Sequence, residues 1–330
     1  MQRTSSIHRV CRVLAAGVVA GVVSSAGPAR AVLIQTVSGT DNTSAPADDP
    51  GFANVGYANN PNGTAIYIGG GWVLTAGHVG GTGIVLASGT YLQATGSNTS
   101  FTLVNNAPGK TTYTDLYMFK LATEPVGLPT LAIAPSMPAL TEAVTMIGGG
   151  RDRGAFQEWT VDDQTTPWTW TGTTSGGDAA GYGTLATQAI RWGTNEVASN
   201  DFWERSVYGV GPTDYHDVKS FATDFAILPG STEAQAVLKD SGGAVFTKVG
   251  GQWLLAGVIF SVGGFSGQPD PVFTAVFGND TFIADLSYYR AQIVAVVPEP
   301  SGVGLVGGAV GLLMGAVTRR RRPSLAVRPA

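Results

Sequence analysis

Short apolar runs separated by turn residues fill the middle of this 330-residue chain. Clusters of Gly, Asn and Pro, such as those at 60–63 and 69–71, recur roughly every 8 to 12 residues. The β-prone runs between the clusters include 64–68, 72–75, 116–121, 143–147 and 253–260. Short strands at this spacing predict a loop-rich all-β fold, either a barrel or a sandwich.

Three segments of the body depart from this pattern. The Pro- and Ala-rich stretch 124–139 predicts a linker between two halves. Apolar residues in 281–294 fall roughly on one face and predict a single helix. Residues 151–220 are rich in Trp, Thr, Gly and Asp. Exposed loops or extra hairpins are the simpler interpretation of this stretch, and a substrate-binding surface is the alternative.

Charge and cysteine content exclude several classes of function. Between Val32 and Val297 there are 10 Lys and Arg against 22 Asp and Glu, a net charge of −12. Such an acidic body argues against a nucleic-acid partner. The single cysteine is Cys11, near the amino terminus. The body therefore has no thiol nucleophile, no two-cysteine zinc site and no disulfide framework.

The first 31 residues have the organisation of a secretory signal peptide. Three arginines precede the apolar run 13–26, and Ala29-Arg30-Ala31 offers a cleavage site with small residues. The apolar run is short for a membrane anchor, which is the alternative. We expect a signal peptidase to remove residues 1–31.

The carboxyl-terminal segment has the organisation of a second targeting signal. Pro298-Glu299-Pro300 is followed by an uncharged apolar stretch, 301–317, and then by four arginines. The stretch is near the lower limit for a transmembrane helix, and the arginines would stay in the cytoplasm. This order resembles the PEP-CTERM sorting signal of Gram-negative bacteria, here 297–322 with a tail at 323–330. The resemblance implies processing by an exosortase, transient membrane anchoring, and a final place at the cell surface or in the extracellular matrix.

His78 is the first residue that carries chemistry. It closes an apolar run, Trp-Val-Leu-Thr-Ala-Gly, that begins at Trp72. Histidine can accept and return a proton near neutral pH. Between the two end segments the chain has only one other histidine, His216. A structural role is the alternative for His78.

Ser241 lies in the sequence Lys239-Asp240-Ser241-Gly242-Gly243. A serine hydroxyl becomes a good nucleophile only when a base takes its proton and N–H groups face the developing oxyanion. The glycines allow the tight turn that could supply such groups.

Asp115 stands at the head of the apolar run 116–121, where a carboxylate is costly to bury without a partner. It follows His78 by 37 residues and precedes Ser241 by 126. Asp162 and Asp163 are the alternatives, but their surroundings are polar.

The sequence around His78, the sequence around Ser241 and the order His, Asp, Ser resemble those of trypsin/chymotrypsin-like serine peptidases. Here Gly77 replaces the second alanine of the family's Thr-Ala-Ala-His motif. The resemblance implies a peptidase domain at 32–296 with two antiparallel six-stranded β-barrels, about 32–135 and 136–296, and a short C-terminal helix. The expected fold also includes an N-terminal signal helix and a C-terminal transmembrane helix.

The resemblance also implies a role for each residue. Ser241 attacks a peptide carbonyl, His78 transfers the proton, and Asp115 orients the imidazole. The backbone N–H groups of Lys239 and Ser241 form the oxyanion hole. No metal and no organic cofactor are implied, and the expected substrate is a protein or peptide.

Substrate-binding residues follow from the same resemblance. Gln235 falls at the floor of the primary specificity pocket, where an acidic residue would select Arg or Lys, so no strong tryptic preference is expected. Glu233 is close enough to keep this assignment open. Ser261, Val262 and Gly263 match the strand that pairs with the substrate backbone.

Two positions depart from the family pattern. Lys239 replaces a glycine that usually has a left-handed backbone, at a cost of roughly 1–2 kcal/mol. An incomplete oxyanion hole would make the protein a catalytically impaired binding protein at the cell surface or in an exopolysaccharide matrix. A barrel that only displays the Trp-rich region and an ester-hydrolysing enzyme are further alternatives.

Asp240 matches the residue that pairs with a freed N-terminus in zymogen-activated relatives. Signal cleavage would expose Val32-Leu33-Ile34, which lacks the usual glycines. We therefore expect an internal partner for Asp240 and no need for proteolytic activation.

Overall fold

The structure is a computed structural model that describes residues 32–209, 211 and 213–298. The predicted signal peptide and the predicted transmembrane segment at 301–317 lie outside these residues. Among the described residues, no helix is long and apolar enough to cross a membrane.

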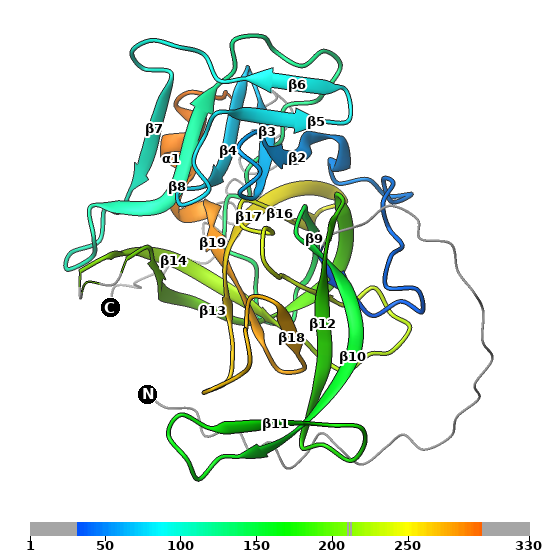
Figure 1. Cartoon of the computed structure of the whole chain (residues 1–330). Helices are drawn as coiled ribbons and strands as arrows, with labels where there is room; N and C mark the ends of the chain where they lie inside the picture. The colour runs from blue at the N-terminus through cyan, green and yellow to red at the C-terminus, as the bar shows by residue number, and fades with distance from the viewer. Residues whose placement is uncertain (1–31, 210, 212, 299–330) are drawn as a thin grey trace, which may run out of the picture.

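The amino-terminal half is one antiparallel sheet of seven strands, in the order β6-β5-β2-β3-β4-β8-β7, shown at the top of Figure 1. A short 3-10 helix, η2 (Phe52–Asn54), precedes it. Its strands are β2 (Val55–Ala58), β3 (Thr64–Gly69), β4 (Trp72–Ala76), β5 (Gly83–Leu86), β6 (Gly89–Leu92), β7 (Ser100–Val104) and β8 (Tyr113–Lys120).

The carboxyl-terminal half is a closed antiparallel barrel in the order β13-β14-β19-β17-β16-β9. Its strands are β9 (Ala143–Gly148), β13 (Arg191–Val207), β14 (Tyr215–Asp224), β16 (Ala244–Val249), β17 (Gln252–Gly263) and β19 (Asp280–Asp285). The predicted all-β fold with two barrel-like sheets is confirmed. The first sheet differs in detail, because it has seven strands and two edges instead of six strands in a closed ring.

A third sheet, in the order β11-β10-β12-β18, extends below the barrel in Figure 1. Its strands are β10 (Arg151–Asp162), β11 (Thr169–Thr173), β12 (Ala179–Gln188) and β18 (Thr274–Val276). The first part of the Trp-rich stretch, 151–188, thus forms extra hairpins, as the simpler interpretation has it, whereas the rest of the stretch supplies the barrel strands β13 and β14. In addition, β1 (Leu33–Ile34) pairs with β15 (Ala234–Gln235), so the first described residues lie against the carboxyl-terminal half.

The helix α1 (Leu286–Val294) begins later than predicted. Residues 281–285, which the sequence assigns to the helix, belong to β19 because they complete the barrel between β14 and β17. Asp285 then caps the helix, accepting a hydrogen bond from the Ser287 N–H at 2.9 Å. Leu286, Tyr289 and Ile293 are buried, so the helix packs one face onto the fold.

The strands that hold the candidate site are almost wholly buried. Every residue of β4 is buried, and β4 lies between β3 and β8 in the middle of its sheet. Each buried Val or Leu of β4 contributes roughly 1.5–3 kcal/mol through the hydrophobic effect. The end of β4, where His78 follows, is therefore attached to a rigid support.

Candidate active site

His78 and Asp115 meet because β4 and β8 are neighbours. Ala76 pairs with Leu116, and the Gly77 N–H donates to the Asp115 carbonyl at 3.0 Å. One carboxylate oxygen of Asp115 then accepts the His78 backbone N–H at 2.8 Å, and the other lies 2.7 Å from Nδ1 of His78. A Cβ on Gly77 would lie 2.8 Å from Oδ1 of Asp115, so a side chain at this position would crowd the carboxylate.

This contact sets the protonation of the imidazole. Asp115 is 1% exposed and the His78 side chain is 36% exposed. Burial, the largest single influence, lowers the pKa of His78, but the hydrogen bond and the charge of Asp115 together raise its pKa above 6.5. With Nδ1–H facing the carboxylate, Nε2 of neutral His78 is left as the proton acceptor.

Ser206 is a contact of Asp115 that the sequence did not reveal. Its hydroxyl donates to Oδ2 of Asp115 at 2.5 Å, from the end of β13. Ser206 comes from the long β13–β14 hairpin, in a stretch where polar residues are frequent. No local pattern distinguishes this serine from the other polar residues of the strand.

The Ser241 loop lies against the amino-terminal sheet. The Thr64 N–H donates to the Ser241 carbonyl at 2.8 Å. A Cβ on Gly63 would lie 2.6 Å from that carbonyl and 2.7 Å from a methyl of Val79, the residue after His78. The structure thus brings the Ser241 loop next to the His78 loop. The Ser241 hydroxyl is 3.5 Å from the Phe260 carbonyl, the long limit of a hydrogen bond.

Gly242 makes this close approach possible. Its φ is +88°, and a Cβ there would lie 1.8 Å from the Thr64 carbonyl and 2.4 Å from the Thr75 hydroxyl. Any side chain at this position would force the loop away from β3 and β4.

Lys239 has the left-handed backbone that its place in the motif implies, with φ of +78°. Its carbonyl accepts the Thr64 hydroxyl at 3.0 Å, and its ammonium lies 3.3 Å from the Gln188 side-chain oxygen. Within 32–209, 211 and 213–298, the N–H groups of Lys239 and Ser241 donate to no protein acceptor.

Asp240 is fully buried between these two residues. Its carboxylate accepts the backbone N–H groups of Val237 and Gly150 at 2.8 Å and of Val32 at 3.4 Å. Burial raises the pKa of Asp240 to about 7, against the lowering by these donors. Gly150 and Val237 are internal partners, whereas Val32 is the residue that cleavage after Ala31 would make the N-terminus.

The predicted substrate-binding residues lie together. Gln235 is buried in β15, and its side-chain N–H donates to the Asp280 carbonyl at 3.1 Å. Asp280 pairs with Gly263 at the end of β17, and Val262 and Ser261 follow in the same ladder. Glu233 is also buried, and burial raises its pKa to about 7.

The alternative aspartates lie in the third sheet. Asp162 and Asp163 are exposed at the end of β10, in the third sheet. In the part of the chain that the structure describes, no three His, Cys, Asp or Glu side chains gather as a metal site would require.

The chain matches no protein-family model and no curated protein sequence. Its structure is similar to that of the Rv3671c protease of M. tuberculosis in its active form, at 14% identity and a TM-score of 0.42, over 85% of this chain and 96% of that one. It is also similar to the structure of mouse neuropsin, a serine protease, at 13% identity and a TM-score of 0.45, over 78% of this chain and 98% of that one. A third similar structure is that of a mutant of human heparin binding protein, at 14% identity and a TM-score of 0.46, over 78% of this chain and 96% of that one.

Proposed function

We propose that this protein is a serine endopeptidase that hydrolyses peptide bonds in protein substrates. One observation carries the proposal. The buried carboxylate of Asp115 holds both the backbone and the imidazole of His78, beside a serine loop that presents two unbonded N–H groups. A base, a nucleophile and oxyanion donors are the parts that acyl transfer needs.

The reaction follows from the roles of these groups. Nε2 of His78 takes the hydroxyl proton of Ser241 as Oγ bonds to the substrate carbonyl carbon. The oxyanion forms hydrogen bonds with the N–H groups of Lys239 and Ser241. His78 then gives the proton to the leaving amine as the C–N bond breaks, and Asp115 stabilises the imidazolium in between. Water, deprotonated by His78, hydrolyses the acyl-enzyme and frees Ser241.

The test is labelling by a fluorophosphonate together with casein hydrolysis. We expect the purified protein to be labelled and to degrade casein, and Ser241→Ala to do neither. Ser199→Ala, a partly buried serine of β13, is the control that should behave as the wild type. A well-folded wild type without labelling would support the binding-protein alternative. A protein that is labelled and hydrolyses a model ester, but does not degrade casein, would support the esterase alternative.

We further propose that the protein is exported, loses residues 1–31, and reaches the cell surface or matrix after exosortase-type processing near Pro298. The residue patterns at the two ends support this proposal. Mass spectrometry of the protein recovered from the cell surface and of the protein recovered from the membrane tests this proposal. Replacing Pro298 and Glu299 by alanine should leave the membrane-bound form in place.

Lys239 offers a prediction about backbone strain. Lys239→Gly and Lys239→Ala both remove the amine, but only glycine adopts a φ of +78° without strain. We expect the glycine variant to be about 1 kcal/mol more stable than the alanine variant in urea unfolding. We expect both to keep fluorophosphonate labelling, because the Thr64 hydroxyl still holds the carbonyl of residue 239. A more stable alanine variant would mean that the loop is not left-handed in solution.

Asp240 predicts how stability depends on pH. Its pKa of about 7 lies above its ordinary 3.8. Between these values the folded chain holds a proton that the unfolded chain has lost, so stability falls as the pH rises from about 4 to about 7. The fall can reach about 1.4 kcal/mol for each pH unit.

Two chains, one beginning at Val32 and one retaining Ala31, test this dependence. An ammonium group on Val32 would lie 3.4 Å from the Asp240 carboxylate and lower its pKa. We therefore expect a smaller fall in stability for the chain that begins at Val32, measured by urea unfolding at pH 5 and pH 7. Equal curves would contradict this expectation. We expect both chains to be labelled, because Gly150 and Val237 already hold Asp240.

A further inference from the structure

The carboxylate of Asp115 has a donor from the other half of the molecule. Asp115 and His78 belong to the amino-terminal sheet, whereas Ser206 belongs to β13 of the barrel. The Ser206 hydroxyl donates to the same oxygen, Oδ2, that lies 2.7 Å from Nδ1 of His78. Ser206 is 7% exposed and Asp115 is 1% exposed. Since bulk water has little access, this hydrogen bond is not readily replaced by solvent.

We propose that Ser206 is a positioning residue for the His78–Asp115 pair; the proposal rests on the proposed peptidase function. The carboxylate accepts three donors: the His78 N–H on Oδ1, and Nδ1–H and the Ser206 hydroxyl on Oδ2. Rotation of the carboxylate about its Cβ–Cγ bond would misalign all three. Ser206 therefore limits the carboxylate to the orientation in which Oδ2 faces the imidazole.

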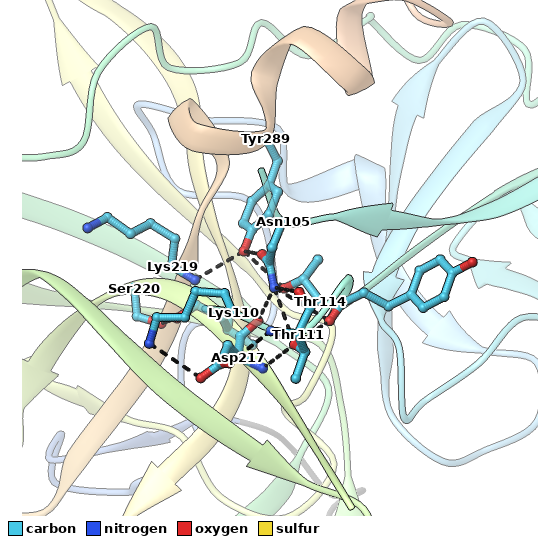
Figure 2. A network of polar contacts seen from close by, with 10 residues as sticks. Asn105, Lys110, Thr111, Thr114, Asp217, Lys219, Ser220 and Tyr289 are labelled. Carbon is cyan, nitrogen blue, oxygen red and sulfur yellow. Dashed lines mark hydrogen bonds and ion pairs between the residues drawn. The ribbon is translucent and has the colours of Figure 1, made fainter. Parts of the chain in front are cut away.

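The hairpin that carries Ser206 is itself fixed near this point. Ser206 pairs with His216 on β14, and the next residue is the buried Asp217. The Asp217 carboxylate accepts the Thr111 N–H at 3.0 Å and forms an ion pair with Lys110 at 3.5 Å. The Asp217 N–H in turn donates to the Thr111 hydroxyl at 2.8 Å. Figure 2 shows these contacts between β14 and the segment that leads into β8.

Tyr289 of α1 extends the same network to the residue before Asp115. Its hydroxyl lies 3.0 Å from the Thr114 hydroxyl, donates to the Asn105 side-chain oxygen at 2.8 Å, and accepts the Lys219 N–H at 3.0 Å (Figure 2). Thr114 is on β8 and Lys219 is on β14. Tyr289 is fully buried. Its phenol joins β8, which carries Asp115, to β14, which pairs with the Ser206 strand β13.

The alignment of β14 with β8 is fixed close to the Ser206–Asp115 bond. Here Asp217 and Tyr289 hold β14 and β8 together on the side of Ser206 and Asp115. The geometry of the proton acceptor is thus set by both halves of the fold.

The experiment compares Ser206→Ala with Ser206→Thr and with the control Ser199→Ala. We expect Ser206→Ala to lower kcat on a peptide substrate about tenfold with little change in KM, because the substrate-binding residues are untouched. Ser206→Thr keeps the hydroxyl and should recover most of the rate. Ser199→Ala should match the wild type. Urea unfolding of each variant checks that the folds remain comparable.

Proton NMR of His78 supplies a readout that does not depend on turnover. We expect the Nδ1 proton of His78 to be protected from exchange in the wild type, in Ser199→Ala and in Ser206→Thr, and to exchange faster in Ser206→Ala. Unchanged exchange together with an unchanged kcat in Ser206→Ala would overturn the proposal. If the wild type shows no peptidase activity, the proposed function fails, and the exchange rates alone decide whether Ser206 positions the pair.

Discussion

Replacing Asp115 by asparagine is expected to lower kcat by about 10⁴ while leaving the fold intact. Asparagine has nearly the same shape, but a side-chain NH₂ facing Nδ1 of His78 favours the tautomer that carries its proton on Nε2. That tautomer cannot accept the Ser241 proton. The NH₂ group also cannot accept from Ser206, which now donates to Oδ2 at 2.5 Å.

Steady-state kinetics and urea unfolding measure this effect. Asp201→Asn is the matched control, because Asp201 is 79% exposed and its carboxylate forms an ion pair with Lys219. We expect the control to keep the wild-type rate. We also expect the pKa of His78 to fall in Asp115→Asn, since burial lowers it and the contacts that raise it are removed. A variant that kept a tenth or more of the wild-type kcat would contradict the assignment of Asp115.

Replacing Gly242 by alanine is expected to have the second large effect. The added Cβ would lie 1.8 Å from the Thr64 carbonyl, a backbone atom that cannot move without disturbing β3. The φ of +88° adds the strain of a left-handed backbone. Together these effects should lower the free energy of unfolding by about 2–5 kcal/mol. Fluorophosphonate labelling should be lost, because the Ser241 loop must move away from His78.

Gly250→Ala separates crowding from strain. Gly250 has a φ of +57° with nothing within 4 Å of its Cβ position. We expect this control to lose only about 1–2 kcal/mol, the cost of the left-handed backbone, and to keep full labelling. Equal losses of stability in the two variants, with labelling retained in both, would show that the Ser241 loop does not pack against Thr64 in solution.

The features of the fold that depend on local sequence patterns, namely the strands, the turns and the backbone of the serine motif, could be predicted from the sequence. The apolar run before His78 and the one after Asp115 correspond to β4 and β8, which the structure pairs with Ala76 opposite Leu116. The alternation of short strands and turns predicts the all-β class. The left-handed backbone of Lys239 follows from the place of that residue in the serine motif.

The remainder depends on contacts between segments far apart in the chain. Ser206 reaches Asp115 over 91 residues, and no pattern near either residue reports that meeting. Residues 281–285 have a helix-like spacing of apolar side chains, but pairing with both β14 and β17 makes them a strand. Tertiary pairing decides the state of such short segments, because an isolated turn of helix is only marginally stable.

The division of the site between the two halves has a consequence for the timing of activity. His78 and Asp115 belong to the amino-terminal sheet, while Ser241 and Ser206 belong to the part of the chain built around the barrel. A chain that is synthesised from its amino terminus can therefore form the sheet long before it holds a nucleophile. Under the proposed function, hydrolysis begins only once the barrel has closed onto the sheet, so a partly synthesised or partly unfolded molecule would not cut its neighbours or other copies of itself.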